Sequence, residues 1–104
     1  MDCIFCKIIN KEAPADIVYE NEKVIAFYDI RPSAPIHILI VPKKHLKSVR
    51  EIKEEDKNLM GELFLVAQKI AEEKNLKAHK LLVRTGREAG QMVDHIHMHL
   101  LANK

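Results

Sequence analysis

Three of the chain's six histidines lie at alternate positions near the C-terminus, and their type and spacing are well suited to chemistry. His95, His97 and His99 are separated by the apolar residues Ile96 and Met98. Because successive side chains of a β-strand point to opposite faces, this alternation places three imidazoles in a row on one face and the apolar residues toward the core. Imidazole changes charge near neutral pH and has two distinct nitrogens, so the row is suited to an anion, a metal or a proton.

The histidine row allows three interpretations. A half-exposed strand that carries polar histidines needs no function. A metal held by all three imidazoles is awkward, because alternate residues of a strand lie about 6.5–7 Å apart. The chemistry favours an anion site in which the central imidazole, His97, attacks phosphorus while its neighbours donate hydrogen bonds to the developing charge. The loop Gly86 to Gln91 leads toward this row, and its glycines allow backbone N–H groups to approach an anion.

Cys3 and Cys6 form the second group of residues with chemical potential. On a helix, two thiols three residues apart share a face and can chelate one ion. The pair supplies only half of a tetrahedral zinc site, however. Two reduced, buried cysteines are the plain alternative. A redox-active pair is less favoured, because the usual strand-to-helix context is absent.

The composition limits the classes of function. The 104 residues predict a single domain, 1–104, with one small core. Acidic and basic residues are interspersed and the formal charge is +2, so we expect no nucleic-acid partner. No apolar stretch approaches the ~20 residues needed to span a bilayer, so we expect no membrane partner. The absence of a signal-peptide pattern and the presence of only two cysteines favour the reducing cytoplasm.

The elements that must position these residues follow from hydrophobic periodicity and turn signals. We expect a short amphipathic helix capped by Asp2, and a long helix with a broad apolar stripe in which Gly61 allows close packing. The expected strands and long helix, in order, are strands 17–20, 24–28 and 36–41, helix 53–75, and strands 81–83 and 93–101. The pattern predicts an α+β fold, a five-stranded antiparallel sheet with one short and one long helix.

The segment His95 to Leu101 resembles the His-φ-His-φ-His-φ-φ signature of the histidine triad (HIT) family, in which φ is an apolar residue. Further blocks resemble the same family in the same order: Cys3–Ile9, Ala26–Ile30, Ala34–His37, Val41–His45 and Gly86–Gln91. The match is most similar to the Hint branch. It implies a HIT-like fold, a homodimer built on part of the long helix and the fourth strand, and a purine nucleoside phosphoramidase or nucleotidyl hydrolase without an organic cofactor.

The resemblance assigns the catalytic roles to three histidines. His97 would attack the α-phosphorus of an AMP or GMP derivative, expel an amine and form a nucleotidyl-histidine that water cleaves. His99 would contact the phosphate and the leaving group. His37, on the third strand, would support the nucleophile. Gln91, with the backbone around Gly90 and Met92, would hold the phosphate.

The nucleotide contacts implied by the resemblance are a carboxylate and an apolar surface. Asp29 would accept hydrogen bonds from the ribose hydroxyls, which suits a group that only accepts. The residues that would surround the base are Ile4, Phe5, Ile8, Phe27 and Ile30. These five are equally compatible with an ordinary hydrophobic core.

Two positions depart from the Hint pattern. Arg84 stands where that branch usually has asparagine, and it would either supply charge to the phosphate or pair with Asp94. Met92 stands where the branch usually has a serine near the leaving group, and a thioether cannot replace a hydroxyl as a hydrogen-bond donor. The preference for a leaving group is therefore open, whereas the nucleophile is not.

The resemblance also supplies a ligand set for a metal. Some bacterial HIT proteins hold structural zinc with two cysteines, the histidine after Pro-Lys-x and the first histidine of the triad. The matching residues here are Cys3, Cys6, His45 and His95. Two alternatives to a phosphoramidase remain: a dinucleoside polyphosphate hydrolase, and a zinc-stabilised nucleotide-binding or interaction module with little turnover.

Overall fold

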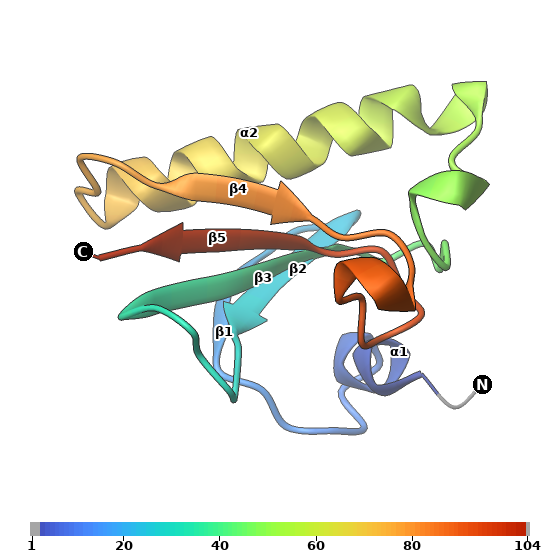
Figure 1. Ribbon diagram of the computed structural model, residues 1–104, viewed down its shortest axis with the longest axis horizontal. Coiled ribbons are helices and arrows are strands. Elements are labelled where there is room, and N and C mark those ends of the chain that lie inside the picture. Colours follow the sequence, from blue (N-terminus) through green and yellow to red (C-terminus); the bar gives the residue numbers. More distant parts are fainter. Residues whose placement is uncertain (1–2, 104) are drawn as a thin grey trace.

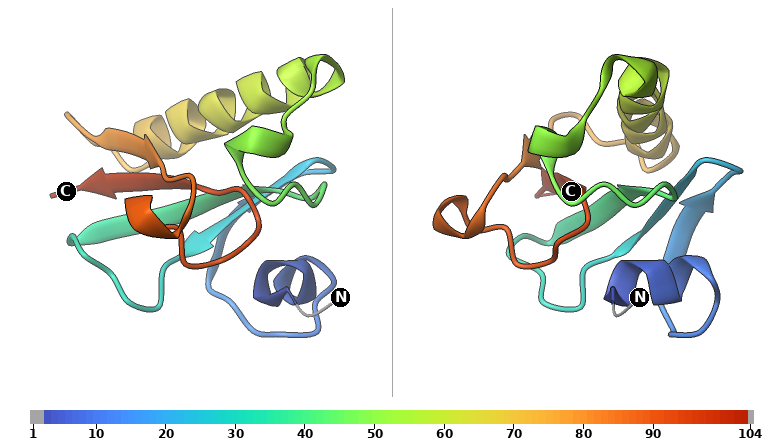
Figure 2. Two further views of the ribbon diagram at one scale, coloured as in Figure 1. Left: turned by 45° about the vertical axis from the view of Figure 1, so that its right-hand side comes forward. Right: turned by 90° about the vertical axis from the view of Figure 1, so that its right-hand side faces the viewer.

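A five-stranded antiparallel sheet lies between two helices in the computed structural model, which describes residues 3–103. The α-helices and strands are α1 (Ile4–Ile9), β1 (Ile17–Glu20), β2 (Val24–Tyr28), β3 (Ile36–Pro42), α2 (Lys57–Glu73), β4 (Lys80–Val83) and β5 (Met98–Ala102). Neighbouring strands follow the order β1-β2-β3-β5-β4. The views from different sides place α2 over one face of the sheet and the short α1 against the other (Figures 1 and 2). This is the α+β arrangement predicted from the sequence.

The sheet separates two hydrophobic clusters, because alternate strand residues point to opposite faces. The larger cluster joins α2 to Ala26, Ile38, Met98 and Leu100. The smaller joins Phe5 and Ile8 of α1 to apolar residues of β2 and β3 that include Leu39 and Val41. His99 pairs with Leu39 across β3 and β5 and so belongs to the face that α1 covers. The predicted separation of the triad from the apolar residues is therefore confirmed at β5.

The last strand is shorter than expected: it begins at Met98, not at residue 93. The backbone N–H of Ile96 donates to the carbonyl of Leu46 at 2.7 Å, and that of His95 donates to Val93. These two donors are therefore not available for a sheet ladder, and the first two triad histidines lie on a bent segment before the strand. The prediction of one straight histidine row was wrong.

The helix ends also differ from the predictions. The expected cap Asp2 lies outside the described residues, and Cys3 caps α1 by accepting the N–H of Cys6 at Sγ. A 3-10 turn, Glu54–Asp56, precedes α2, because the Asp56 carboxylate accepts the N–H of Lys53 and pairs with Lys44. At Gly61 an added Cβ would meet no atom within 4 Å, so the expected close packing is absent. No helix among residues 3–103 has the length and apolar character needed to cross a membrane.

Candidate functional site

The bend before β5 divides the histidines into two groups. His95 turns toward His45, with ring centroids 4.7 Å apart. His97 and His99 stay together at 4.9 Å, and His37 of β3 joins them at 5.1 Å from His99. The three triad members therefore have separate environments.

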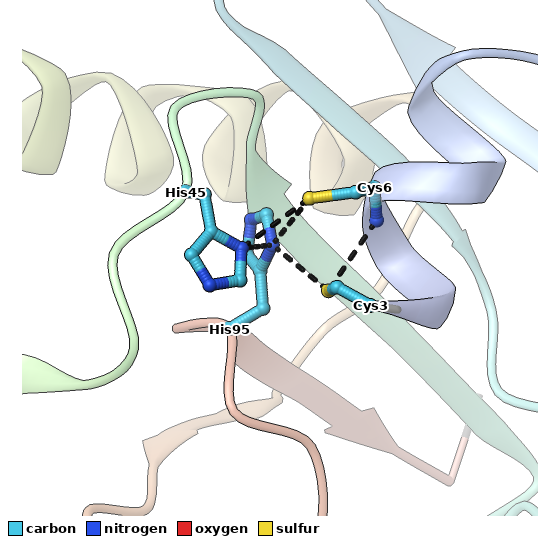
Figure 3. A group of neighbouring side chains, drawn as sticks. All are labelled: Cys3, Cys6, His45 and His95. Carbon is cyan, nitrogen blue, oxygen red and sulfur yellow. Dashed lines mark hydrogen bonds between the residues drawn. The ribbon is translucent and has the colours of Figure 1, made fainter. Parts of the chain in front are cut away.

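The first group contains Cys3, Cys6, His45 and His95, whose side chains converge from three parts of the chain (Figure 3). Both thiols come from the start of α1, His45 follows β3, and His95 precedes β5. One ligand atom from each residue can be chosen so that all four lie within 4.8 Å of one another. This cluster can hold a metal ion.

The distances within the cluster suit tetrahedral coordination. The His95 Nδ1 atom lies 3.4 Å from Cys3 Sγ, 3.7 Å from Cys6 Sγ and 3.0 Å from His45 Nδ1. Cys6 Sγ lies 3.3 Å from His45 Nδ1. Zinc bonds to sulfur and nitrogen would place such atoms roughly 3.3–3.8 Å apart. Small adjustments would therefore bring all four atoms to one ion.

His95 presents the correct nitrogen to the cluster. Its Nε2–H donates to the carbonyl of Pro42 at 2.8 Å, which leaves the lone pair on Nδ1, the atom that faces the thiols. A second hydrogen bond of this kind commonly orients a metal-bound histidine. Burial lowers the pKa of His95 to about 4, so the imidazole is neutral, as a ligand must be. The donor set therefore fits a metal in chemistry as well as in distance.

In His97 the ring proton is on Nδ1, the other nitrogen from that in His95. Its Nδ1–H donates to the carbonyl of His95 at 2.8 Å, so the lone pair is on Nε2. Burial lowers the pKa of His97, which favours the neutral ring. The edge of the Phe5 ring packs against the imidazole with centroids 5.0 Å apart. His97 is thus held with one nitrogen able to act as a nucleophile.

His37 and His99 form a hydrogen-bonded chain beside His97. The backbone N–H of Ser33 donates to His37 Nδ1 at 3.0 Å, so the His37 proton is on Nε2. That proton faces His99 Nδ1 at 2.9 Å and the Asp29 carboxylate at 3.3 Å. His99 accepts at Nδ1 and therefore carries its own proton on Nε2. Burial lowers the pKa of His99 to about 4, so His99 is a neutral donor at pH 7.

The hydrogen bonds that link Ser33, His37 and His99 argue against a second metal site. Asp29, His37 and His99 also lie close enough to hold an ion. Binding through His37 Nε2 would move its proton to Nδ1, where it would face the N–H of Ser33. Two donors would then oppose each other. The hydrogen bonds therefore favour a proton-ordered pair of imidazoles. Ser33 was missed by sequence analysis, since its contribution is a backbone N–H.

The loop before the bend has two glycines in left-handed backbone conformations, Gly86 at φ +91° and Gly90 at φ +94°. The buried Gln91 fixes the loop: its Oε1 accepts the N–H of Gly86, and its Nε2 donates to the carbonyls of Lys47 and Val93. A phosphate contact by this side chain would require breaking those bonds. Within residues 3–103, the N–H of Met92 has no such partner, so donating to an anion would break no existing hydrogen bond.

Arg84 does not pair with Asp94. The Asp94 carboxylate instead binds both guanidinium nitrogens of Arg87, at 2.9 and 3.2 Å. The guanidinium of Arg84 packs on the loop: a Cβ built on Gly90 would lie 2.7 Å from its Nη1. Of the two roles open from the sequence, the ion pair is therefore excluded in this structure.

The residues expected around the base divide by exposure. Phe5, Ile8 and Phe27 are buried members of the smaller cluster, with the rings of Phe5 and Phe27 5.5 Å apart. Ile4 is 46% exposed and Ile30 is 90% exposed, so both can meet a ligand directly. Asp29 is partly exposed beside His37. Of these five apolar residues, three are therefore buried beneath the surface and two lie exposed at its edge.

Comparison with known proteins agrees with this geometry. The family model described as "Scavenger mRNA decapping enzyme C-term binding" matches residues 2–104. A purine nucleoside phosphoramidase of Escherichia coli (strain K12) is 44% identical over 105 residues, which span 99% of this chain and 88% of that protein.

Solved structures give the same result. A histidine triad protein from Clostridium difficile is 44% identical, with a TM-score of 0.96 over 100% of this chain and 92% of that one. A HIT family hydrolase from Legionella pneumophila is 39% identical, with a TM-score of 0.96 over 99% of this chain and 94% of that one.

Proposed function

The chain belongs to the histidine triad family, and we propose that it is a hydrolase that transfers a purine nucleotide to His97 and then to water. The substrates are derivatives of a purine nucleoside monophosphate, such as AMP or GMP, with a P–N or related bond at the α-phosphorus. One observation carries the proposal: the Nδ1–H of His97 donates to the carbonyl of His95, which leaves the Nε2 lone pair for attack. The phosphoramidase activity named for the relative from E. coli supports the reaction type.

In the first step His97 Nε2 forms a bond to phosphorus, and the bond to the leaving group breaks. His99 donates its Nε2–H to the phosphate or the leaving group, because His37 already occupies its other nitrogen. In the second step water attacks the nucleotidyl-histidine, which releases the monophosphate and restores the imidazole. The N–H of Met92 holds the phosphate, whereas the N–H of Gly90 is already used by the carbonyl of Arg87.

The nucleoside lies on the face of the sheet that α1 covers. Asp29 accepts hydrogen bonds from the ribose hydroxyls through its partly exposed carboxylate. The exposed side chains of Ile4 and Ile30 contact the base. Phe5, Ile8 and Phe27 support that surface from below. Of the five apolar residues expected around the base, two are therefore proposed to contact it directly and three to support those two.

The cluster of Cys3, Cys6, His45 and His95 holds zinc in this proposal. Two thiolates and two imidazoles are a common ligand set for structural zinc. A zinc ion bound there would supply a closed cross-link rather than a reactive water. The cross-link would connect α1, the segment after β3 and the segment before β5. A reducing compartment such as the cytoplasm suits two cysteines that form no disulfide.

We also propose that two copies associate through α2 and β4. Phe64 and Leu65 of α2 are both more than half exposed. β4 is an edge strand, which leaves one row of backbone groups open to pairing. Sedimentation velocity should give a dimer for the wild type and a monomer for Phe64→Asp. A wild-type monomer at micromolar concentration would contradict the association.

The reaction is tested with an adenosine 5′-phosphoramidate. The wild type should release AMP and amine, His97→Ala should abolish release, and Cys3→Ala should retain it after correction for folded protein. Equal turnover by His97→Ala would remove His97 as the nucleophile. Binding without turnover by the wild type would favour the nucleotide-binding module. If the protein were a dinucleoside polyphosphate hydrolase, it would cleave a dinucleoside polyphosphate much faster than the phosphoramidate.

A further inference from the structure

Arg84 faces the same site as the catalytic histidines. β4 pairs with β5 so that Leu82 lies opposite His99 and Val83 opposite Met98. Arg84 directly follows the last residue of β4, two positions after Leu82, so strand alternation directs its side chain toward the face that carries His99. Nη1 of Arg84 lies 2.7 Å from the place of a Cβ on Gly90, so its side chain extends over the loop that leads to the histidines. Its positive charge also adds, after burial and the neighbouring His97 and His37, to the lowering of the pKa of His99. The guanidinium is therefore close enough to act on a bound phosphate derivative.

Within the part of the chain that the structure describes, the guanidinium of Arg84 has no counter-ion. Among residues 3–103, no carboxylate forms an ion pair with Arg84, while the nearby Arg87 is neutralised by Asp94. The guanidinium instead packs against Gly90, where the missing Cβ leaves room for it. An unpaired guanidinium beside two neutral imidazoles is suited to an anion, because its planar fork matches phosphate and carboxylate oxygens.

The groups near the loop differ in their ability to supply a proton. An amine leaving group must gain a proton as the P–N bond breaks, whereas a carboxylate, phosphate or phenolate departs with the electron pair alone. A guanidinium does not give up a proton in a catalytic step, so Arg84 is not a proton donor. Met92, 78% exposed on the loop, has a thioether and no proton to give. An amine would therefore depend on the Nε2–H of His99 for its proton, whereas Arg84 can stabilise a leaving group that departs as an anion without any proton transfer.

We propose that Arg84 makes this enzyme selective for nucleotide substrates whose leaving group departs as an oxyanion. In the step itself, His97 Nε2 bonds to phosphorus, the P–O bond to the leaving group breaks, and the oxygen retains the electron pair. Arg84 stabilises the resulting negative charge, and water later releases the nucleoside monophosphate. The inference rests on the proposed attack by His97 and adds a substrate class to it.

The test compares two adenosine substrates with the same nucleotide. One is the 4-nitrophenyl ester of AMP, which releases a phenolate, and the other is an alkyl phosphoramidate, which releases an amine. Arg84→Asn should lower kcat/KM for the ester roughly 10- to 100-fold, the effect of losing a hydrogen bond to a charged group. Its effect on the phosphoramidate should be at least about tenfold smaller. Arg84→Lys retains the charge and should recover much of the activity on the ester.

Lys77→Gln is the matched control, since it removes one exposed positive charge from the connector before β4. This substitution should leave kcat/KM unchanged for both substrates. Equal losses on the two substrates in Arg84→Asn would overturn the inference and leave the His97 mechanism intact. Absence of turnover on both substrates by the wild type would overturn the proposed function and the inference together.

Discussion

The carbonyl oxygen of His95 lies 2.8 Å from Nδ1 of His97 and accepts a hydrogen bond from its N–H. His95 thereby serves two sites at once: its side chain belongs to the Cys/His cluster that can hold a metal ion, and its backbone fixes the tautomer of the proposed nucleophile. The two sites also share α1, because Cys3 and Cys6 enter the cluster while Phe5 packs on both His95 and His97. The Cys/His cluster is therefore connected to the framework that orients His97 through His95 and α1.

Asp29→Asn should weaken the discrimination between ribose and deoxyribose. The wild type is expected to prefer the ribonucleotide phosphoramidate over its 2′-deoxy analogue by about tenfold in KM, the effect of one hydrogen bond to a charged acceptor. In the variant this ratio should approach one. Asp16→Asn, at an exposed carboxylate outside the site, is the control and should keep the wild-type ratio. An unchanged ratio in Asp29→Asn would place the ribose elsewhere.

Zinc should bind and stabilise the chain through the four-residue cluster. Protein purified without a histidine tag should contain about one zinc per chain. At free zinc of 100 times Kd, binding would add about 2.7 kcal/mol to the free energy of unfolding. A chelator should therefore lower the Tm of the wild type. His45→Ala should show neither the zinc nor the chelator effect, whereas His79→Ala, an exposed histidine outside the cluster, should show both. Less than about half an ion per chain would contradict the site.

His99 should make the fold less stable in mild acid. In the unfolded chain the imidazole gains a proton as the pH falls through about 6.5. Burial lowers the pKa of His99 in the folded chain to about 4. Between these values the unfolded chain binds more protons, so the free energy of unfolding should decrease as the pH falls from 6.5 toward 4. Urea unfolding should show that the free energy of unfolding depends less steeply on pH in His99→Gln than in the wild type. Parallel pH dependences in the two proteins would exclude His99 as a source of the acid sensitivity.

Gly90→Ala should destabilise the loop for two separable reasons. The left-handed backbone costs a residue with a Cβ about 1–2 kcal/mol, and the new methyl group would lie 2.7 Å from Nη1 of Arg84. Arg84→Asn should relieve only the second cost, so a double-mutant cycle should give a favourable coupling. Gly61→Ala is the contrasting change: its Cβ meets nothing within 4 Å, and a helical alanine should add up to about 1 kcal/mol. Strict additivity at Gly90 and Arg84 would contradict the packing.

Local pattern sufficed for most of the fold. The strands at 17–20 and 24–28 were predicted with their observed bounds, because two short runs of apolar residues on either side of an Asn-containing turn define them. The start of α2 was placed four residues too early, since the first turn forms a separate 3-10 segment stabilised by a distant lysine, Lys44. A contact across twelve residues of sequence leaves no periodic signal.

The site was predictable in its residue types and less so in its geometry. Alternation correctly placed His99 on the face of the sheet opposite the larger hydrophobic cluster. The bend at His95 instead depends on the hydrogen bond from the N–H of Ile96 to Leu46, which is distant in sequence. Gln91 and Arg84 both stood near the expected phosphate, and only the fold distinguishes them. The amide of Gln91 is used internally, while Arg84 is left without a carboxylate within the described chain.

The central claim is that His97 carries the nucleotide between the two steps. The most direct measurement is mass spectrometry of the protein mixed briefly with an adenosine 5′-phosphoramidate and quenched in alkaline denaturant, which preserves phosphorus–imidazole bonds. We predict one added adenylyl group on the peptide that contains residues 95–99, located at His97 by fragmentation and absent from His97→Ala. An adduct on His95 or His99, or release of AMP by His97→Ala at the wild-type rate, would contradict the account.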